Sequence, residues 1–488
     1  VDSGDTSELV ASALTLSNPH PPGYPLHALL GRLAASLPVG GPAFRVGLVS
    51  TVAGALTALG AGVLAGGAAM ALGIPGTGAG LLAALAWACS PAFWWLTAIG
   101  EKYPLAMAGA AGGVAALWAH ARDGRPRSLL GAALLAGIAL DCHLMGAFLL
   151  PVLAASLWRI PDRRRTAILA VAWLLLALSL KPLYAGIRAA ADPLINWETP
   201  DRVGRLLSYL LVLRYGDRFY GLSAAGEIGA RVLSHVMRFP WHELGLLLLA
   251  SLPGWWSMKR GPAGTRLGAV LRVGASIAIA SVYRMYFIVA YYLPVIWILA
   301  MLGGVGAAWT ARRWRPALAI WAVLAALHAR SAADAAWRSR SYLVPDHLRN
   351  MQTGVPPGGV VLATFNFWLF PQWYGEAAGT TGPGPMIVRG GGMTFDEPEE
   401  RRGLERALGA SAPAIRRFQE GPRLYWELAR LFAPRPLFNT KDEMPLGSPS
   451  RGARWHGILL RIADAREPLS VDSRSARFVG AWRLRDVV

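Results

Sequence analysis

Apolar runs long enough to cross a lipid bilayer recur along this chain, and they constrain its fold more than any other feature. A helix needs about 20 residues to span a hydrocarbon core of about 30 Å. Such runs lie near 43–72, 78–100, 103–120, 166–187, 241–258, 266–283, 286–308 and 316–329. Because 54% of the residues are hydrophobic and only 16% are charged, an ordinary soluble enzyme is excluded. The sequence predicts a mainly α polytopic membrane bundle.

The stretch 128–158 is a long apolar segment interrupted in its middle by Asp141, Cys142 and His143. Arginines flank both of its ends. A single tilted helix would put these two basic flanks on opposite faces of the membrane, whereas two short helices keep them on one face. We therefore expect a helical hairpin here, which brings the predicted total to ten crossings.

Basic residues account for the net charge of +19, and they gather in short loops between the apolar runs. The positive-inside rule assigns such clusters to the cytoplasmic face, so they do not indicate nucleic-acid binding. The other face then collects the acidic loops and both termini. We expect a multi-pass protein of the bacterial inner (plasma) membrane whose active-site loops are extracytoplasmic. The basic clusters lie at 122–127, 159–165, 259–266 and 312–315.

Composition divides the chain into a transmembrane domain, 1–330, and a tail, 331–488, with denser charge and shorter apolar runs. The tail predicts a small extracytoplasmic α/β domain. Its expected strands are Val360–Thr364, Met386–Val388 and His456–Ile462, with a helical segment at Leu424–Phe432. The chain starts at Val1 with a polar segment, so we expect a first spanning helix to be missing from this sequence. Cys89 and Cys142 lie in or beside apolar stretches and are expected to be packing residues.

Three carboxylates, those of Asp2, Asp5 and Glu8, precede the first apolar sequence. A carboxylate placed there could act as a general base, or hold a divalent cation near a lipid phosphate. The alternative is a solvated loop whose Asp or Ser caps a helix starting near Glu8. Spacing alone does not decide between these two hypotheses.

His20 and Tyr24 sit in a turn with three prolines and a glycine, Asn18-Pro-His-Pro-Pro-Gly-Tyr-Pro25. Prolines leave the backbone few conformations, so the turn presents two polar aromatic groups rigidly, as a binding loop does. The residues by themselves favour the alternative of a connector leading into an interfacial helix at Leu26–Leu37.

Two further outer turns carry ionisable groups. Trp94 and Trp95 are typical of the headgroup belt, and Glu101 and Tyr103 follow them. Lys102 could simply neutralise Glu101. At the predicted hairpin tip, Asp141 and His143 are functional candidates because burying ionisable groups at membrane depth is costly, although a lone histidine can also be a satisfied core residue.

The loop 196–219 combines aromatic residues with Arg214, Asp217 and Arg218. Arginine binds phosphate through two parallel hydrogen bonds, but the arginines could equally extend along the membrane interface. Gly390–Gly392 is only a weak indication of a phosphate loop, because it lacks the fingerprint spacing.

Several ordered motifs resemble a family of multi-span membrane proteins of bacteria and eukaryotes, formerly a domain of unknown function, that includes a eukaryotic endoplasmic-reticulum protein O-mannosyltransferase acting on plexin-type receptors. The resemblance covers most of 5–220. The family's Asp-x-x-Glu is matched by Asp5 and Glu8, and Glu101-Lys-Tyr-Pro-Leu105 is similar to its Glu-Val-Tyr-Pro-Leu. Further matches are His20-Pro-Pro-Gly-Tyr-Pro-Leu26, Ala43-Phe-Arg-Val46, His143-Leu-Met145 and Tyr215-Gly-Asp217.

This resemblance implies a GT-C glycosyltransferase that uses a polyprenyl-phosphate sugar, with mannose as one candidate. The family usually reads Asp-Ser-Gly-Glu, whereas Asp2-Ser-Gly-Asp5 stands here, so Asp2 competes with Asp5 for the role of base. Asp5 and Glu8 are expected to be catalytic. Donor binding is expected from His20, Tyr24, Glu101, Tyr103, His143, Arg214, Asp217 and Arg218.

No cofactor is expected with certainty, and a divalent metal ion is compatible with the acidic residues although no ligand set is readable. The expected partners are the lipid-linked donor, membrane lipids and a protein, lipid or glycan acceptor. Two other hypotheses remain open. A transporter or flippase of lipid-linked sugars would show repeat symmetry and polar residues through the whole membrane depth, and the third hypothesis is a non-catalytic scaffold in envelope assembly.

Overall fold

The computed structural model describes residues 5–158, 160, 163–213, 233, 239–258, 289–338, 355–356, 358–363, 366–380, 386–389, 405, 435, 437–439, 453–456 and 459–462. The chain forms two compact units. The helical unit contains Pro21–Gly186 and Leu207–Arg340, and the composite unit contains Val1–His20, Ile187–Leu206 and Ser341–Val488. These units follow the division at residue 330 only in part, because the first 20 residues group with the tail. The assignment of two functional domains stays a prediction.

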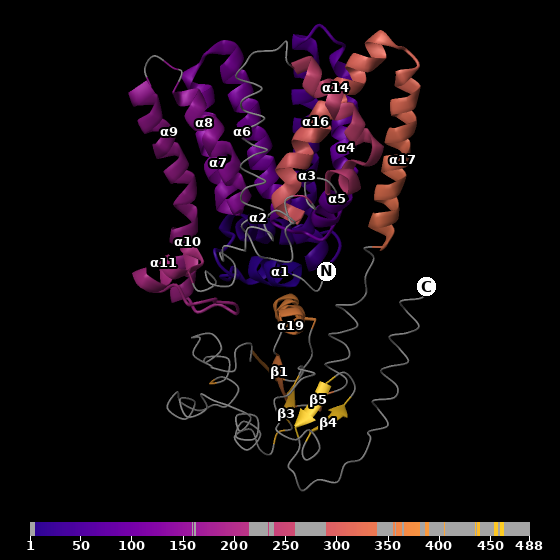
Figure 1. Ribbon diagram of the computed structural model, residues 1–488. Helices are drawn as coiled ribbons and strands as arrows, with labels where there is room; N and C mark the ends of the chain where they lie inside the picture. The colour runs from indigo at the N-terminus through magenta and orange to yellow at the C-terminus, as the bar shows by residue number, and fades with distance from the viewer. Residues whose placement is uncertain are drawn as a thin grey trace. The chain divides into compact units, whose positions relative to one another are not determined.

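Helices that stand side by side make up the helical unit (Figure 1). Many of them begin with proline in the first turn, where its missing N–H has no partner to lose. Their bounds are α2 Pro25–Ala35, α3 Pro42–Ala71, α4 Gly76–Ala88, α5 Pro91–Ala98, α6 Tyr103–Asp123, α7 Pro126–Cys142, η1 Leu144–Leu149, α8 Leu150–Leu157, α9 Arg163–Leu178, α10 Leu180–Ala190 (whose last residues belong to the composite unit), α11 Val203–Leu211 (whose first residues belong to the composite unit), η3 Gly245–Leu247, α14 Leu248–Met258, α16 Val289–Arg313 and α17 Ala317–Arg338.

Within the described residues, three helices are long and apolar enough to cross a membrane: Pro42–Ala71, Arg164–Ala190 and Ala290–Arg313. The run predicted as one span at 78–100 is instead broken into α4 and α5, which are bent by 65° and count together as a fourth candidate. The remaining predicted crossings fall on shorter helices or, for 266–283, outside the described residues. The total of ten crossings therefore stays a prediction.

The predicted hairpin forms in this unit. The chain breaks at His143, which has extended backbone between α7 and η1. Gly146 then lies so close to Ala139 of α7 that a Cβ on this glycine would approach the Ala139 side chain at 2.9 Å. The segment after the break therefore packs back on α7, as predicted from the basic residues at both ends of this stretch.

Helix α16 lies in the core of the helical unit. Of its most apolar window, 72% is buried, compared with 11% for the window in Arg164–Ala190. The indole of Trp297 is buried and donates to the Thr57 carbonyl of α3 at 3.1 Å, so its N–H is satisfied without water. The exposed apolar residues of the other helices, such as Leu59, Val63 and Leu175, are suited to contact lipid.

The composite unit contains α1 (Asp5–Thr15), α19 (Asn366–Ala378), which packs on α1, and a mixed sheet. The strand order is β2-β1-β3-β5-β4. The predicted strand His456–Ile462 is wrong in its extent, because two antiparallel strands meet there, and β3 was not predicted. Leu424–Phe432 lies outside the described residues, and the tail's identity as a separate α/β domain stays a prediction. The strand bounds are β1 Val360–Ala363, β2 Met386–Arg389, β3 Leu437–Asn439, β4 Ala453–His456 and β5 Leu459–Ile462.

Candidate functional site

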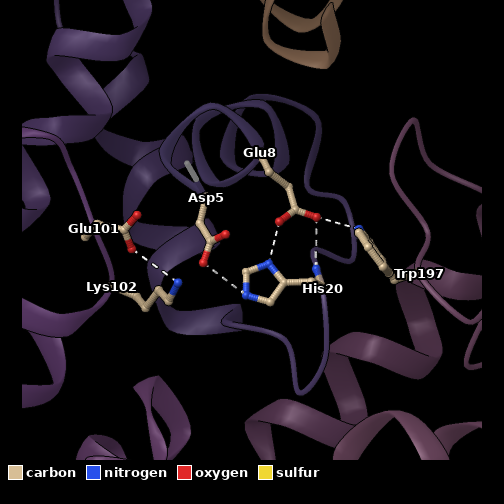
Figure 2. A network of polar contacts seen from close by, with 6 residues as sticks. All are labelled: Asp5, Glu8, His20, Glu101, Lys102 and Trp197. Atoms are coloured by element: carbon tan, nitrogen blue, oxygen red, sulfur yellow. Dashed lines mark hydrogen bonds and ion pairs between the residues drawn. The ribbon is translucent and has the colours of Figure 1, made fainter. Parts of the chain in front are cut away.

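A buried carboxylate, that of Glu8, is the centre of a hydrogen-bond network in the composite unit (Figure 2). Glu8 is fully buried in the first turns of α1. Its Oε1 accepts from the His20 backbone N–H at 3.0 Å and from Trp197 Nε1 at 2.5 Å, and its Oε2 lies 2.5 Å from His20 Nδ1. The hypothesis of a solvated loop up to Glu8 is therefore wrong, because the helix begins by Asp5 and buries this carboxylate.

Asp5 is the accessible carboxylate of the same network. Its Oδ2 lies 3.5 Å from His20 Nε2, and its side chain is 38% exposed. The spacing of three residues on one helix puts Asp5 and Glu8 on the same side of α1, so the His20 imidazole faces a carboxylate at each nitrogen. A protonated imidazole donates from both nitrogens, which makes this position suited to a histidine that gains and loses a proton.

Backbone pairing between two distant segments positions His20 and Trp197. The Asn18 N–H donates to the Ile195 carbonyl at 2.9 Å, and the Trp197 N–H donates to the Asn18 carbonyl at 3.3 Å. The buried Asn18 and Asn196 side chains also bond to each other at 3.1 Å. These contacts join segments 178 residues apart, and the sequence analysis did not predict them.

The second candidate cluster lies in the helical unit, at the turn between α5 and α6. Lys102 Nζ is 3.2 Å from Glu101 Oε2, so the predicted neutralisation of Glu101 is confirmed. The ammonium also lies over the rings of Tyr24 and Tyr103, at 4.9 and 4.7 Å from their centroids. The expectation of a surface turn is wrong for both charged side chains, because Glu101 and Lys102 are 5% and 1% exposed.

The backbone of this turn is held by buried polar groups. His27 of α2 lies with its Nε2 3.2 Å from the Gly100 carbonyl, and Ser50 Oγ of α3 donates to the Glu101 carbonyl at 2.6 Å. Burial lowers the pKa of His27 to about 4, with Lys102 adding a smaller effect in the same direction. His27 is therefore neutral at neutral pH and donates its Nε2–H to Gly100.

The rigid turn before α2 needs its glycine. Gly23 has φ +79°, and a Cβ there would lie 2.5 Å from the Tyr209 hydroxyl oxygen. The turn leads directly into Tyr24, whose ring is buried under the Lys102 ammonium. The predicted helix after this turn is confirmed as α2.

His143 lies in an aromatic environment, with its ring 4.7 Å from that of Tyr103 and 5.0 Å from that of Tyr291, both edge-on. Its Nδ1 accepts from the Met145 backbone N–H at 3.2 Å, which puts the hydrogen of a neutral ring on Nε2. Asp141, 1% exposed, has Lys181 as an opposite charge in its surroundings.

Several predicted site residues lie outside the described residues: Asp2, Arg214, Asp217, Arg218 and Gly390–Gly392. In the part of the chain that the structure describes, no three His, Cys, Asp or Glu side chains form a group that could hold a metal ion. Cys89 and Cys142 are buried and free.

Two comparisons identify similar proteins. Residues 5–166 match the N-terminal domain of the protein O-mannosyl-transferase TMEM260. The fold is similar to a crystal structure of ArnT from Cupriavidus metallidurans in the apo state, with a TM-score of 0.61 and 14% identity over 96% of this chain and 95% of that one. A crystal structure of the same ArnT bound to undecaprenyl phosphate matches with a TM-score of 0.58 and 14% identity, over 96% of this chain and 94% of that one.

These matches confirm the predicted resemblance and the predicted GT-C-like membrane bundle. The chain is an integral membrane protein with a GT-C-like helical bundle, and its N-terminal third resembles the O-mannosyl-transferase family.

Proposed function

We propose that this chain, which has a GT-C-like fold and matches an O-mannosyl-transferase N-terminal domain over residues 5–166, transfers a sugar from a polyprenyl-phosphate donor to an acceptor hydroxyl. The observation that carries the proposal is the Asp5–His20–Glu8 network, in which one carboxylate is accessible and the other is fully buried. A base must reach the acceptor proton. Only the accessible Asp5 meets this condition within the network.

In the proposed reaction, Asp5 takes the proton of the acceptor hydroxyl while the acceptor oxygen forms a bond to the anomeric carbon. The bond between that carbon and the phosphate oxygen breaks, and the lipid phosphate keeps the electron pair. Glu8 orients His20, and His20 orients Asp5, so the base is held before the substrate arrives. Because both nitrogens of His20 already face carboxylates, we favour this orienting role for His20 over the expected phosphate contact.

The leaving phosphate needs hydrogen-bond donors or cations. His143, Arg214 and Arg218 remain proposed donors on sequence grounds. A divalent metal ion is compatible with this scheme, and no step depends on one.

Three finer points belong to the proposal. The donor lipid is an undecaprenyl-type phosphate, a class that the ArnT crystal structure with undecaprenyl phosphate supports. Mannose is the first sugar to test, because residues 5–166 match an O-mannosyl-transferase domain. We assign the network to the extracytoplasmic side of a bacterial inner membrane from the arginine distribution, with a protein, lipid or glycan as the acceptor.

The test measures sugar release from radiolabelled polyprenyl-phosphate hexoses by the full-length protein in lipid. Asp5→Asn is expected to lower turnover at least a hundredfold, a loss of the size that general base catalysis supplies. The matched control, Asp2→Asn, is expected to keep wild-type turnover. A normal rate for Asp5→Asn with a low rate for Asp2→Asn would move the base to Asp2, and tight donor binding without turnover in the wild type would favour a flippase or a scaffold.

A further inference from the structure

Trp197 ties the buried Glu8 carboxylate to a segment 189 residues away in sequence. Its indole is 2% exposed and donates Nε1–H to Glu8 Oε1. Within the part of the chain that the structure describes, the other donors to Glu8 are the backbone N–H and the ring of His20, which both belong to one residue. Trp197 is therefore the contact that anchors Glu8 independently of His20.

The Glu8 carboxylate determines which ring nitrogen of a neutral His20 carries the hydrogen. Glu8 Oε2 is 2.5 Å from Nδ1 and accepts a hydrogen from it. With that hydrogen on Nδ1, the neutral ring presents Nε2 to Asp5 as an acceptor, and the protonated ring presents it as a donor. Nε2 lies 3.5 Å from Asp5 Oδ2, which is longer than an ordinary hydrogen bond. Contacts between catalytic groups are often this long without substrate and shorten when substrate binds.

We propose that Trp197 is a positioning residue, which holds Glu8 so that His20 can accept from Asp5 the proton that Asp5 removes from the acceptor hydroxyl. This inference rests on the proposed function. The proton moves from the acceptor oxygen to Asp5 Oδ2 and then to His20 Nε2, which leaves an imidazolium between two carboxylates. The relay returns Asp5 to its ionised form within the same turnover.

The surroundings of Trp197 fit a positioning role. Its ring lies edge-on to that of Phe370 on α19, with centroids 6.4 Å apart, and has the same separation from the ring of His20. Arg188 donates to the Leu16 and Thr15 carbonyls at the end of α1. The other charged side chains that the structure describes on the neighbouring segments are Asp192, Glu198, Asp201, Arg202, Arg205 and Glu376.

The experiment uses the full-length protein in lipid and the radiolabelled donor assay, run from pH 5.5 to pH 8.5. Trp197→Phe keeps an aromatic ring and removes the N–H. We expect kcat to fall about tenfold, the loss of one hydrogen bond to a charged group, with donor KM unchanged. We also expect the shape of the pH–activity profile to change, because the relay depends on Glu8 and His20, whereas a purely structural role of Trp197 would leave that shape as in the wild type. Trp173→Phe on α9, whose side chain is exposed, is the matched control.

Glu8→Gln supplies an independent readout if Trp197→Phe folds poorly. Its amide oxygen can still serve Trp197, but its NH2 group faces His20 Nδ1 and moves the ring hydrogen to Nε2, which blocks the relay. We expect a loss at least as large as that of Trp197→Phe, and no further loss when the two are combined, since both act through His20.

Wild-type kcat and pH profile in Trp197→Phe, or losses that add in the double variant, would overturn the relay while leaving the transferase function in place. Absence of sugar release by the wild type from every donor would instead remove the proposed function, and the relay with it.

Discussion

Replacing Gly306 by alanine tests how closely α16 packs against α14 in the helical unit. A Cβ on Gly306 would overlap the Ala250 carbonyl oxygen and lie 2.5 Å from the Gly254 nitrogen, about 1 Å short of the ~3.5 Å at which nonbonded atoms attract best. Both neighbours are backbone atoms, which cannot rotate away. The helices must therefore separate, and small residues at such interfaces are what allow membrane helices to approach closely.

Overpacking of this kind costs about 1–3 kcal/mol, and we expect the upper end because two backbone groups are displaced. Unfolding of the purified protein in detergent, followed by tryptophan fluorescence, should show an apparent unfolding temperature lower by about 3 °C. Gly303→Ala is the matched control, one turn away on the same helix, where a Cβ would meet only the Leu247 carbonyl oxygen at 3.5 Å. Equal unfolding temperatures for the two variants would refute the packing argument.

Two further predictions concern buried polar groups of the helical unit. The lowered pKa of His27 means that the unfolded chain binds more protons than the folded one between pH 6.5 and about 4, so stability should fall by up to about 3 kcal/mol as the pH drops through this window. His27→Gln, which can still donate to Gly100, should flatten this dependence in unfolding measurements at pH 4.5, 5.5 and 7, and an unchanged slope would contradict the assignment. Lys102→Met should destabilise the protein by about 3 kcal/mol because it leaves the Glu101 carboxylate buried without its cation, and adding Glu101→Gln should recover most of the loss. A double variant as unstable as Lys102→Met alone would show that the ion pair is not the cause.

Local sequence patterns were sufficient for the parts of the site that lie close together in the chain. Asp5 and Glu8 are one helical turn apart, and the proline-rich turn with His20 follows within 12 residues of Glu8. The same patterns could not show that Glu8 is fully buried while Asp5 remains accessible. That difference carries the proposed function, and it depends on neighbours from elsewhere in the chain.

By itself, the sequence determined that this chain is a membrane bundle, because long apolar helices satisfy their backbone hydrogen bonds internally in the bilayer. It also determined the break at His143, because the basic residues at both ends of the stretch 128–158 are expected on one face of the membrane. Tertiary structure alone decided that Trp197 bonds to Glu8, that α19 packs on α1, and that Lys102 is buried with Glu101. The physical reason is that hydropathy and helical spacing act over a few turns, whereas hydrogen bonds between segments 178 to 189 residues apart follow from how the folded chain brings its surfaces together.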